Sequence, residues 1–199
     1  MVPRIKKLPR AFYNRPTLKV AENLIGKYIV YNAPSGRLSA RIVEVEAYIG
    51  SDDPACHAAR GKTPRNAVMF GKPGFTYIYF IYGMYYCLNF VTEKESRAAA
   101  ILLRAAEPVE GINLMKKGST KTKPQRLLAG PGKFCRAFGL TRAQNGLDLT
   151  GDVIYLEDRN TGADNIIRTP RIGINHGTEL NWRFCDADSD AVSTYKRRT

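Results

Sequence analysis

The sequence predicts an α+β fold, in a single mixed domain that is rich in strands. A chain of 199 residues with 44% hydrophobic and 25% charged residues has the size and composition of one globular domain. Several segments are rich in β-branched and aromatic residues and end at Gly, Pro or Asn, which is typical of strands. We therefore expect one domain over residues 1–199, with a basic lead at 1–16, a basic tail at 194–199 and strands that curl toward a barrel.

The individual elements follow from local signals. Residues 17–27 are expected to form a helix, because Thr17 can cap it and Gly26 can end it. The Pro- and Gly-rich segment 50–74 is expected to be a long loop, and such loops in a small domain are usually functional. Residues 77–90 are expected to form two strands that meet near Tyr82 and Gly83. Further strands are expected at 28–32, 38–49, 98–105, 153–156, 171–175 and 181–184, and helices at 109–117 and within 127–138.

The basic residues are clustered. The formal net charge is +13, and residues 111–147 contain eight Lys or Arg and no acid, while residues 1–21 contain six and no acid. Such blocks can simply be solvated surface, but asymmetric basic patches are typical of proteins that bind a polyanion. Together with the aromatic residues described below, they favour nucleic acid as the partner.

Several classes of protein are disfavoured by what the sequence lacks. The four cysteines are at least 31 positions apart and form no CxxC pair, so we expect reduced, buried thiols and no metal site. No apolar run approaches the roughly 20 residues that span a bilayer. The basic start lacks the apolar segment of a signal peptide, so we expect a cytoplasmic protein with no membrane contact.

The segment ARIVEVEAYIG places two glutamates in one expected strand. Alternation puts the side chains at 43, 45, 47 and 49 on a core face, and those of Ile42, Glu44, Glu46 and Tyr48 on the other face. That second face is either solvated or lines a cleft, and its aliphatic and aromatic members favour the cleft. A carboxylate in a cleft is a candidate general base.

Of the two histidines, His57 follows the glutamate strand closely, in the expected functional loop. A lone histidine is more often structural than catalytic, but this proximity makes His57 a candidate site residue. His176, in GINHGTEL, has no comparable neighbourhood, and we expect it to be structural.

The segment YIYFIYGMYYCLNF holds five tyrosines and two phenylalanines in fourteen residues. Alternation puts Tyr77, Tyr79 and Ile81 on one face, and Tyr82 at the turn. A tyrosine-rich core with hydrogen-bonded hydroxyls is one interpretation. The other is a set of rings that stack on a base, with Tyr82 as a wedge between base pairs.

These features combine into one hypothesis, an enzyme that flips a base out of the duplex and acts on it. A carboxylate could activate water at the sugar C1′ and stabilise the oxocarbenium-like charge that forms as the base departs.

Five blocks of the sequence resemble the alkyladenine (3-methyladenine) DNA glycosylase family, the type found in mammals and many bacteria. They occur in order between residues 17 and 193 and have unusual composition. The resemblance implies a bacterial member of the family, with a curled antiparallel sheet flanked by helices and a protruding β-hairpin. The blocks are RIVEVEAYIG, TPRN, KPGFTYIYFIYGMYYCLNF, ILLRAAEPVEG and LAGPGKFCRAFGL.

The resemblance also implies roles for single residues. Glu46 matches the base that activates the attacking water, and Arg104 matches an arginine beside that water and the phosphate of the target nucleotide. A second set matches the base pocket and would enclose the flipped base, with Asn89 disfavouring the amine of guanine; it comprises Tyr48, His57, Tyr79 and Asn89. A third set matches the residues of DNA intercalation. Of these, Tyr82 would fill the gap in the stack, and Met69 would lie near the opposing strand.

By the same resemblance, the protein is a monofunctional, metal-free hydrolase of N-glycosyl bonds without lyase activity or cofactor. Its substrates would be alkylated purines in double-stranded DNA, such as 3-methyladenine and 7-methylguanine and, as harder cases, hypoxanthine and ethenoadenine. It would start base excision repair as a monomer associated with the nucleoid. The N-terminal extension of mammalian members is absent, the loop between His57 and Thr63 is slightly shorter, and the acidic segment 186–190 departs from the basic pattern.

Three alternatives remain open at this point. The first is a lyase-type glycosylase that forms a Schiff base through a lysine, for which Lys72 is the nearest candidate. The second is a non-catalytic nucleic-acid binder that uses the same rings. The third is a metal nuclease built on Glu44, Glu46, Asp52 and Asp53.

Overall fold

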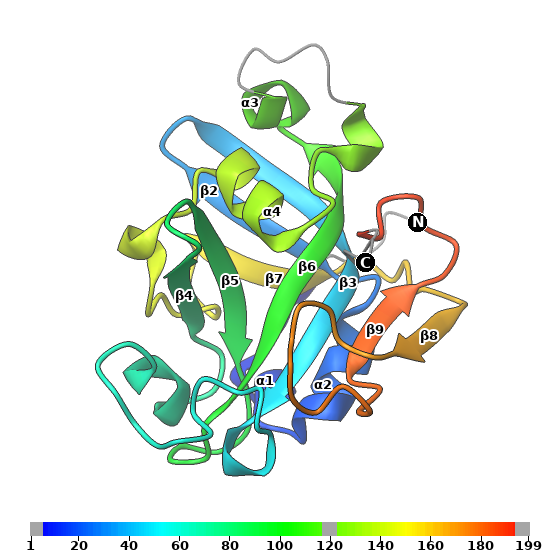
Figure 1. The fold of residues 1–199 in the computed structure, drawn as a ribbon. Helices are drawn as coiled ribbons and strands as arrows, with labels where there is room; N and C mark the ends of the chain where they lie inside the picture. The colour runs from blue at the N-terminus through cyan, green and yellow to red at the C-terminus, as the bar shows by residue number, and fades with distance from the viewer. Residues whose placement is uncertain (1–5, 117–122, 194–199) are drawn as a thin grey trace.

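A single antiparallel β-sheet forms the centre of the fold (Figure 1). The computed structural model describes residues 6–116 and 123–193. Within them the strand order is β1-β7-β2-β3-β6-β5-β4, and β9 joins β3 on one side and β8 on the other. The strands are β1 (Lys6–Lys7), β2 (Tyr28–Ala33), β3 (Gly36–Ile49), β4 (Thr76–Ile81), β5 (Tyr85–Val91), β6 (Ala99–Glu110), β7 (Ile154–Asp158), β8 (Ile166–Thr169) and β9 (Arg183–Asp186).

The helices are short, and they connect or cover the strands. The α-helices are α1 (Arg10–Tyr13), α2 (Thr17–Leu24), α3 (Ile112–Lys116) and α4 (Pro131–Phe138). Four 3-10 turns complete the described elements, namely η1 (Gly50–Asp52), η2 (Ala67–Phe70), η3 (Pro124–Arg126) and η4 (Arg142–Gln144). The α+β class is therefore confirmed, and the sheet stays open, because β1 and β4 end its path without pairing to each other.

Strand β3 is the axis of the sheet. Along one edge it pairs with β6 from residue 39 to residue 49. Along the other edge it pairs first with β2, through residues 36–41, and then with β9, through residues 44–46. The middle of β3 is thus flanked by strands at both edges, and side chains there are buried on both faces of the sheet.

Three irregularities interrupt the pairing of β3 with β6, and two of them flank Glu44. Ile42 pairs with Ala106 and Glu44 with Ala105, which leaves Val43 as an extra residue on β3. Glu44 pairs with Ala105 and Val45 with Leu103, which leaves Arg104 as an extra residue on β6. Bulges of this kind turn side chains to new directions and are frequent beside active sites.

These bulges correct the predicted faces of β3. Ile42 packs in the main core with Val45 and Ala47, and not beside the glutamates. Val43 packs on the other side in a small cluster with Ala105 and Ala191. The alternation that the sequence predicts therefore fails between residues 42 and 44, where the extra residue reverses the phase.

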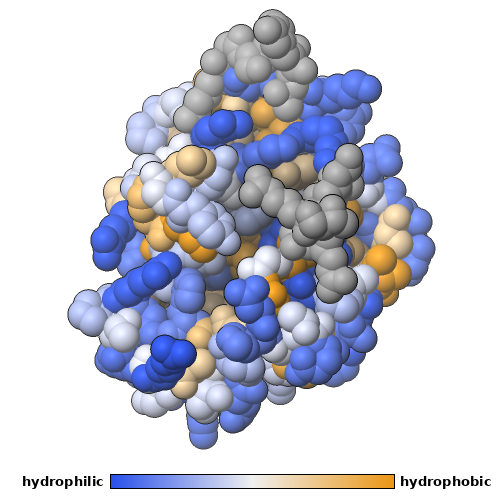
Figure 2. Space-filling view, viewed as in Figure 1, coloured by the Kyte–Doolittle hydropathy of each residue, from blue (hydrophilic) through white to orange (hydrophobic). Residues whose placement is uncertain are grey.

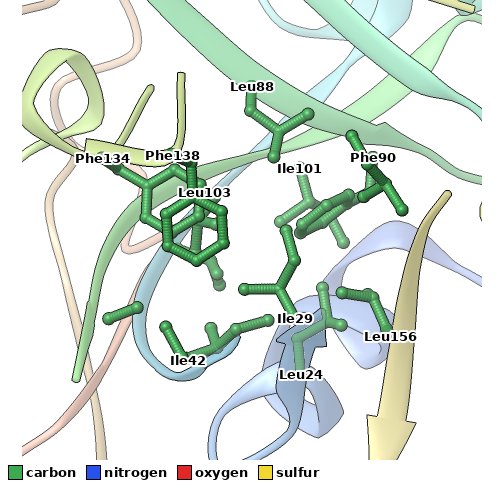
Figure 3. Packing of buried hydrophobic residues seen from close by; sticks show 14 of the residues in the cluster. Leu24, Ile29, Ile42, Leu88, Phe90, Ile101, Leu103, Phe134, Phe138 and Leu156 are labelled. Carbon is green, nitrogen blue, oxygen red and sulfur yellow. The ribbon is translucent and has the colours of Figure 1, made fainter. Parts of the chain in front are cut away.

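The main core lies between the sheet and helices α2 and α4. Phe134 and Phe138 of α4 stack with their ring centroids 4.2 Å apart, and Leu24 of α2 joins the same cluster (Figure 3). Spacing of four positions puts the two phenylalanines on one face of the helix. The sheet contributes residues from seven strands, among them Ile29, Ile42, Leu88, Phe90, Ile101, Leu103 and Leu156.

A second cluster packs the long loop against the sheet. Cys56, Ala58 and Met69 come from the loop, and Tyr77 and Ala100 come from β4 and β6. The loop predicted for residues 50–74 is thus real, apart from the short turns η1 and η2, and it is anchored by buried side chains.

Other predicted elements differ in their bounds. Residues 171–175 form no strand, and the short strand there is β8, which pairs with β9. Helix α3 begins at Ile112 and not at residue 109, because β6 continues to Glu110 through its pairing with Ser39. The hairpin predicted for residues 77–90 is confirmed as β4 and β5.

The expected basic lead is part of the fold from Lys6 onward. Lys6 and Lys7 pair with β7, and Arg10 donates a hydrogen bond to the carbonyl of Pro73 at 2.7 Å. The expected basic tail at 194–199 lies outside the described residues, as do residues 1–5. In the part of the chain that the structure describes, no helix has the length and apolar character needed to span a membrane.

Removing the ring of Phe138 should destabilise the protein strongly. Its side chain is 2% exposed in the main core, so Phe138→Ala is expected to lower the free energy of unfolding by about 3–5 kcal/mol. Phe80→Ala is the matched control, because Phe80 is 47% exposed, and it should cost under about 1 kcal/mol. Urea denaturation of both variants measures this difference, and equal losses would contradict the assigned core.

The four cysteines should resist alkylation in the folded protein. All are free and buried, and burial raises the pKa of Cys87 to about 11 and that of Cys185 to about 12. Because only the thiolate attacks iodoacetamide, none should react at pH 8 in the native state, and the rate at Cys87 should rise as the pH approaches 11. Mass spectrometry after timed alkylation tests this. Rapid modification of Cys87 at pH 8 would contradict its burial, and urea-unfolded protein is the positive control.

Candidate active site

A cavity of about 480 Å³ opens between the sheet and two loops. Its volume is within the range of about 300–1,000 Å³ that is usual for small-molecule sites. Strands β4, β5 and β6 form one wall, and the loops that follow β3 and β8 form the other. The lining residues are Tyr48, Pro54, Ala55, His57, Met69, Tyr77, Tyr79, Ile81, Tyr82, Cys87, Asn89, Ala100, Leu102, Arg104, Pro131, Ile172, Gly173, Ile174, Asn175 and His176.

Glu46 lies directly behind this wall. Its side chain is fully buried, and its three hydrogen-bond donors, Tyr48, Arg104 and Ile172, all line the cavity. The Tyr48 hydroxyl donates to Oε2 at 2.9 Å, an Arg104 guanidinium N–H donates to Oε2 at 3.3 Å, and the Ile172 backbone N–H donates to Oε1 at 2.7 Å. The solvated-face interpretation of the glutamates is therefore wrong.

Glu44 is also fully buried, and it binds two arginines. Its Oε1 accepts hydrogen bonds from Arg104 Nε at 2.9 Å and Arg183 Nε at 2.7 Å. The backbone N–H of Ser193 donates to Oε2 at 2.6 Å. Burial by itself would raise the pKa of Glu44, but Arg104 and Arg183 outweigh it and hold that pKa below its usual value.

Arg104 therefore bridges the two carboxylates. It is the extra residue of the β6 bulge, and it is 8% exposed at the cavity wall. Burial opposes its charge, but Glu46 and Glu44 outweigh this and raise the pKa of Arg104. A permanent cation thus lies beside the buried Glu46 carboxylate, in the position that stabilises an anion there.

Aromatic rings form the cavity wall that β4 provides. Tyr77 and Tyr79 point into it, as the alternation predicts, with their centroids 5.5 Å apart. The His57 ring packs edge-on against Tyr79 at 4.5 Å, and its Nδ1 lies 3.0 Å from the Tyr77 hydroxyl. The predicted residues Tyr48, His57 and Tyr79 thus all line one cavity.

The protonation of these groups follows from their burial. Burial and the neighbouring Glu46 raise the pKa of Tyr48, and burial and Cys87 raise the pKa of Tyr79. Both hydroxyls therefore stay protonated near neutral pH. Burial, together with the cation of Arg65, lowers the pKa of His57, which favours the neutral imidazole.

Asn89 lines the cavity and is 3% exposed. Its side-chain amide N–H group donates to the backbone carbonyls of Tyr77 at 3.0 Å and Cys87 at 3.4 Å. These bonds fix the orientation of the amide, so Asn89 is a rigid part of the wall.

The hairpin tip extends beyond the cavity. Tyr82 is 75% exposed, and Tyr82 and Gly83 both have positive φ, at 54° and 67°. Positive φ is unusual for a tyrosine, so the turn holds this ring outward at a conformational cost. On the face shown in Figure 2, hydrophobic surface forms only separate patches among hydrophilic residues. The exposed large hydrophobic residues of the hairpin are Phe80, Tyr82, Met84 and Tyr85.

Met69 is buried, whereas a residue that enters DNA would be exposed. It is 2% exposed in the second core cluster, and it contributes to the cavity wall. The exposed methionine beside Tyr82 is Met84, which is 65% exposed. A role for Met69 near the opposing strand stays a prediction.

The second wall of the cavity was not predicted from the sequence. Residues 172–176 line it, including His176, which was expected to be structural, and Ile172, which binds Glu46. Local sequence offers only a weak signal here, namely one of two histidines between two glycines. The position of this loop depends on the pairing of β8 with β9, which joins segments far apart from the glutamate strand in sequence.

The residues of the alternative hypotheses are placed differently. Lys72 is exposed and does not line the cavity. Glu44, Glu46 and Asp53 are each bound by arginine, and Asp52 is 76% exposed at its side chain. Among residues 6–116 and 123–193, no three His, Cys, Asp or Glu side chains are grouped as metal ligands.

Comparison with known proteins agrees with the sequence resemblance. A relative from Methanocella arvoryzae is 50% identical over 191 residues, which cover 94% of this chain and 95% of that protein. One from Chlorobaculum tepidum is 48% identical, covering 95% and 91%, and one from Alkaliphilus oremlandii is 45% identical, covering 94% and 98%. Each is provisionally named a 3-methyladenine DNA glycosylase. The family model of methylpurine-DNA glycosylases matches residues 11–190, and the chain therefore belongs to this family.

Proposed function

We propose that this protein is a monofunctional DNA glycosylase that flips alkylated purines out of duplex DNA and hydrolyses their N-glycosidic bond. The observation that carries the proposal is the buried Glu46 carboxylate directly behind an aromatic cavity. Family membership and the names of the relatives support the same activity. The product would be an abasic site, so the reaction would start base excision repair.

The cavity suits an extruded base. A base inside a duplex cannot reach a buried carboxylate, so it must leave the stack to be attacked. Tyr48 and Tyr79 offer faces for stacking, and Tyr82 at the exposed tip is placed to fill the gap in the duplex. The net charge of +13 supplies the attraction to the phosphate backbone.

Glu46 is suited to activate water. Among the described residues only the Ile172 N–H donates to Oε1, so this oxygen keeps a lone pair for a water proton. The water oxygen would bond to C1′ as the bond from C1′ to the base nitrogen breaks, and the bonding electrons would leave with the base. The proton released by the water would pass to Glu46, whose carboxylate also stabilises the oxocarbenium-like transition state.

Arg104 would act beside this water. Its bonds to Glu44 and Glu46 fix the guanidinium at the cavity wall, where it can also bind the phosphate of the target nucleotide. Because Glu44 binds Arg104 Nε, the guanidinium keeps one orientation without needing the substrate.

The rings favour cationic bases. 3-Methyladenine and 7-methylguanine carry positive charge in DNA, and tyrosine faces attract cations by about 0.5–2 kcal/mol. They are also good leaving groups without an added proton. Neutral hypoxanthine and ethenoadenine need protonation to leave, so their release should be slower. Asn89, held rigidly by its backbone contacts, would disfavour the amine of guanine.

We further propose that the protein acts as a monomer on double-stranded DNA, in the cytoplasm and at the nucleoid, without cofactor or lyase activity. The exposed Lys72 outside the cavity wall argues against Schiff-base chemistry there. Borohydride trapping of the protein on DNA would support a lyase instead. DNA strand cleavage that EDTA abolishes would support the metal nuclease.

Glu46→Gln should abolish base release and keep DNA binding. The amide cannot accept the water proton, although it has nearly the same shape. The wild-type protein and the variant are incubated with methylated DNA in EDTA, and the free bases are measured by chromatography. The wild type should release 3-methyladenine, and the variant should release at least about 100-fold less. Normal release by the variant would remove Glu46 from the mechanism, and no release by either, with binding intact, would leave a damage-binding protein.

Tyr82→Ser should weaken the capture of lesions more than general DNA binding. The ring is expected to occupy the gap that the flipped base leaves, and undamaged duplex offers no such gap. Affinities for methylated and undamaged duplexes are compared by fluorescence anisotropy at one salt concentration. Tyr85→Ser is the control on the same hairpin, because Tyr85 is 39% exposed and does not line the cavity. Equal losses on both duplexes would contradict the wedge role.

A further inference from the structure

A buried ion pair outside the catalytic group connects the two walls of the cavity. Arg171 donates to Asp53 through two N–H···O contacts, of 2.5 Å to Oδ2 and 2.8 Å to Oδ1. Both side chains are 0% exposed, which holds for no other ion pair among the residues that the structure describes. Neither residue lines the cavity, so the pair lies behind its surface.

The guanidinium of Arg171 lies against two rings. Its central carbon is 4.7 Å from the centroid of Tyr48 and 5.1 Å from that of Trp182. Because Tyr48 lines the cavity and Arg171 does not, Arg171 covers the face of the Tyr48 ring that points away from the cavity. The plane of a ring proposed to stack on the base is therefore set by a fixed cation behind it.

Asp53 holds the first wall. Its carboxylate accepts the backbone N–H of Ile49 at 3.2 Å and that of Ala55 at 3.1 Å, which closes the turn after β3. Ala55 and His57 line the cavity. Arg171 is tied to the same strand, because it donates to the carbonyl of Ala47 at 2.9 Å.

The second wall begins at the next residue. Ile172 follows Arg171 directly, and its backbone N–H donates to Oε1 of Glu46 at 2.7 Å. The position of Arg171 thus fixes both the plane of Tyr48 and one donor to the proposed general base. The pair connects the β3 turn, the 172–176 loop and Glu46 into one rigid unit.

Stability alone gives no reason for charges at this place. A buried ion pair is often no more stabilising than apolar residues of similar volume, because both charges lose their hydration. Arg171 Nε is in addition buried without a hydrogen-bond partner among the described residues. An apolar pair would lack two features of the guanidinium, namely its two-pronged contact with the carboxylate and its stacking against two rings.

We propose that Arg171 and Asp53 are positioning residues that hold Tyr48 and, through the Ile172 N–H, Glu46 in the geometry of the reaction. The inference rests on the proposed glycosylase function. It adds two residues to the working parts of the site, neither of which touches the substrate.

The variants separate positioning from folding. Arg171→Met leaves the Asp53 charge buried and unpaired, whereas the double variant Asp53→Asn with Arg171→Met removes both charges. Arg171→Lys keeps the charge but loses the two-pronged contact and the flat stacking surface. The matched control is Arg159→Met, because Arg159 pairs with buried Glu157 at 2.7 Å and lies 4.3 Å from the Tyr28 ring, away from the cavity.

Three quantities are measured on each variant. The first is the saturating single-turnover rate of base release from methylated duplex DNA. The second is the affinity for undamaged and for methylated duplex, and the third is the urea midpoint of unfolding. The fluorescence emission of Trp182, the single tryptophan of the chain, reports directly on the position of Arg171, because the Arg171 guanidinium lies over its ring.

Arg171→Met and Arg171→Lys are expected to lower the saturating rate by about 10- to 100-fold, as misplacement by an ångström does, while affinity for undamaged duplex stays unchanged. The double variant should recover the wild-type urea midpoint of unfolding, but it should not recover the wild-type rate of base release. Trp182 emission should change in the Arg171 variants and stay unchanged in Arg159→Met, which should also keep its rate.

Two results would overturn the inference: recovery of the wild-type rate in the double variant, or a loss of rate in Arg159→Met as large as that in Arg171→Met. If the wild type releases no base, the proposed function fails separately. The positioning role of Arg171 and Asp53 is then judged by the preference for methylated over undamaged duplex. If the stable double variant loses this preference, the positioning role is supported. If the variant keeps the preference, the inference is overturned.

Discussion

The burial of two carboxylates in the middle of β3 is the constraint on which the rest of the site depends. Glu44 and Glu46 are both fully buried, and an unpaired charge there would be prohibitively costly. Arg104 meets this requirement by binding both, and it can do so because it is the extra residue of a bulge on β6. Strand β9 supplies Arg183 as a second cation for Glu44. The irregular pairing of β3 with β6, and the attachment of β9 to the free edge of β3, are therefore what allows the carboxylates to lie inside the sheet.

Rigid and exposed parts of the site are separated along a single hairpin. Near its base, Tyr77 and Asn89 face each other across paired strands and are buried, so their positions are fixed by the sheet. At its tip, Tyr82 leaves the ladder in a conformation with positive φ and is mostly solvent-exposed. The alternation that points Tyr77 and Tyr79 into the cavity thus ends at the turn, where the Tyr82 side chain is exposed. One short segment can in this way provide both a fixed wall and a projecting ring.

The sequence predicted those features that depend on regular local geometry. The hairpin, its turn at Tyr82 and the cavity-facing side of β4 follow from alternation, which β4 obeys without a bulge. The family resemblance led to the proposed roles of Glu46 and Arg104, but it did not predict their contact, because that contact depends on a bulge that local sequence does not mark. The face of Ile42 was wrong for the same reason. The strand predicted at residues 171–175 is wrong, since the place of this loop beside Glu46 results from pairing between β8 and β9, far from β3 in the sequence.

Charge is distributed differently outside and inside the molecule. The whole chain carries a formal charge of +13, which attracts a polyanion over long distances. Around the cavity, by contrast, the carboxylates of Glu44, Glu46 and Asp53 face the guanidinium groups of Arg104, Arg183 and Arg171, so that these six groups together are neutral. A positive cavity would repel a cationic alkylated purine after the protein had been drawn to its phosphates. The paired arginines lessen that conflict, because their charges are balanced locally. The Arg65 guanidinium, 5.3 Å from the Tyr79 ring centroid, is a further cation beside the aromatic wall. Selection for damaged bases can then depend on stacking and shape, while attraction to DNA in general depends on the outer surface.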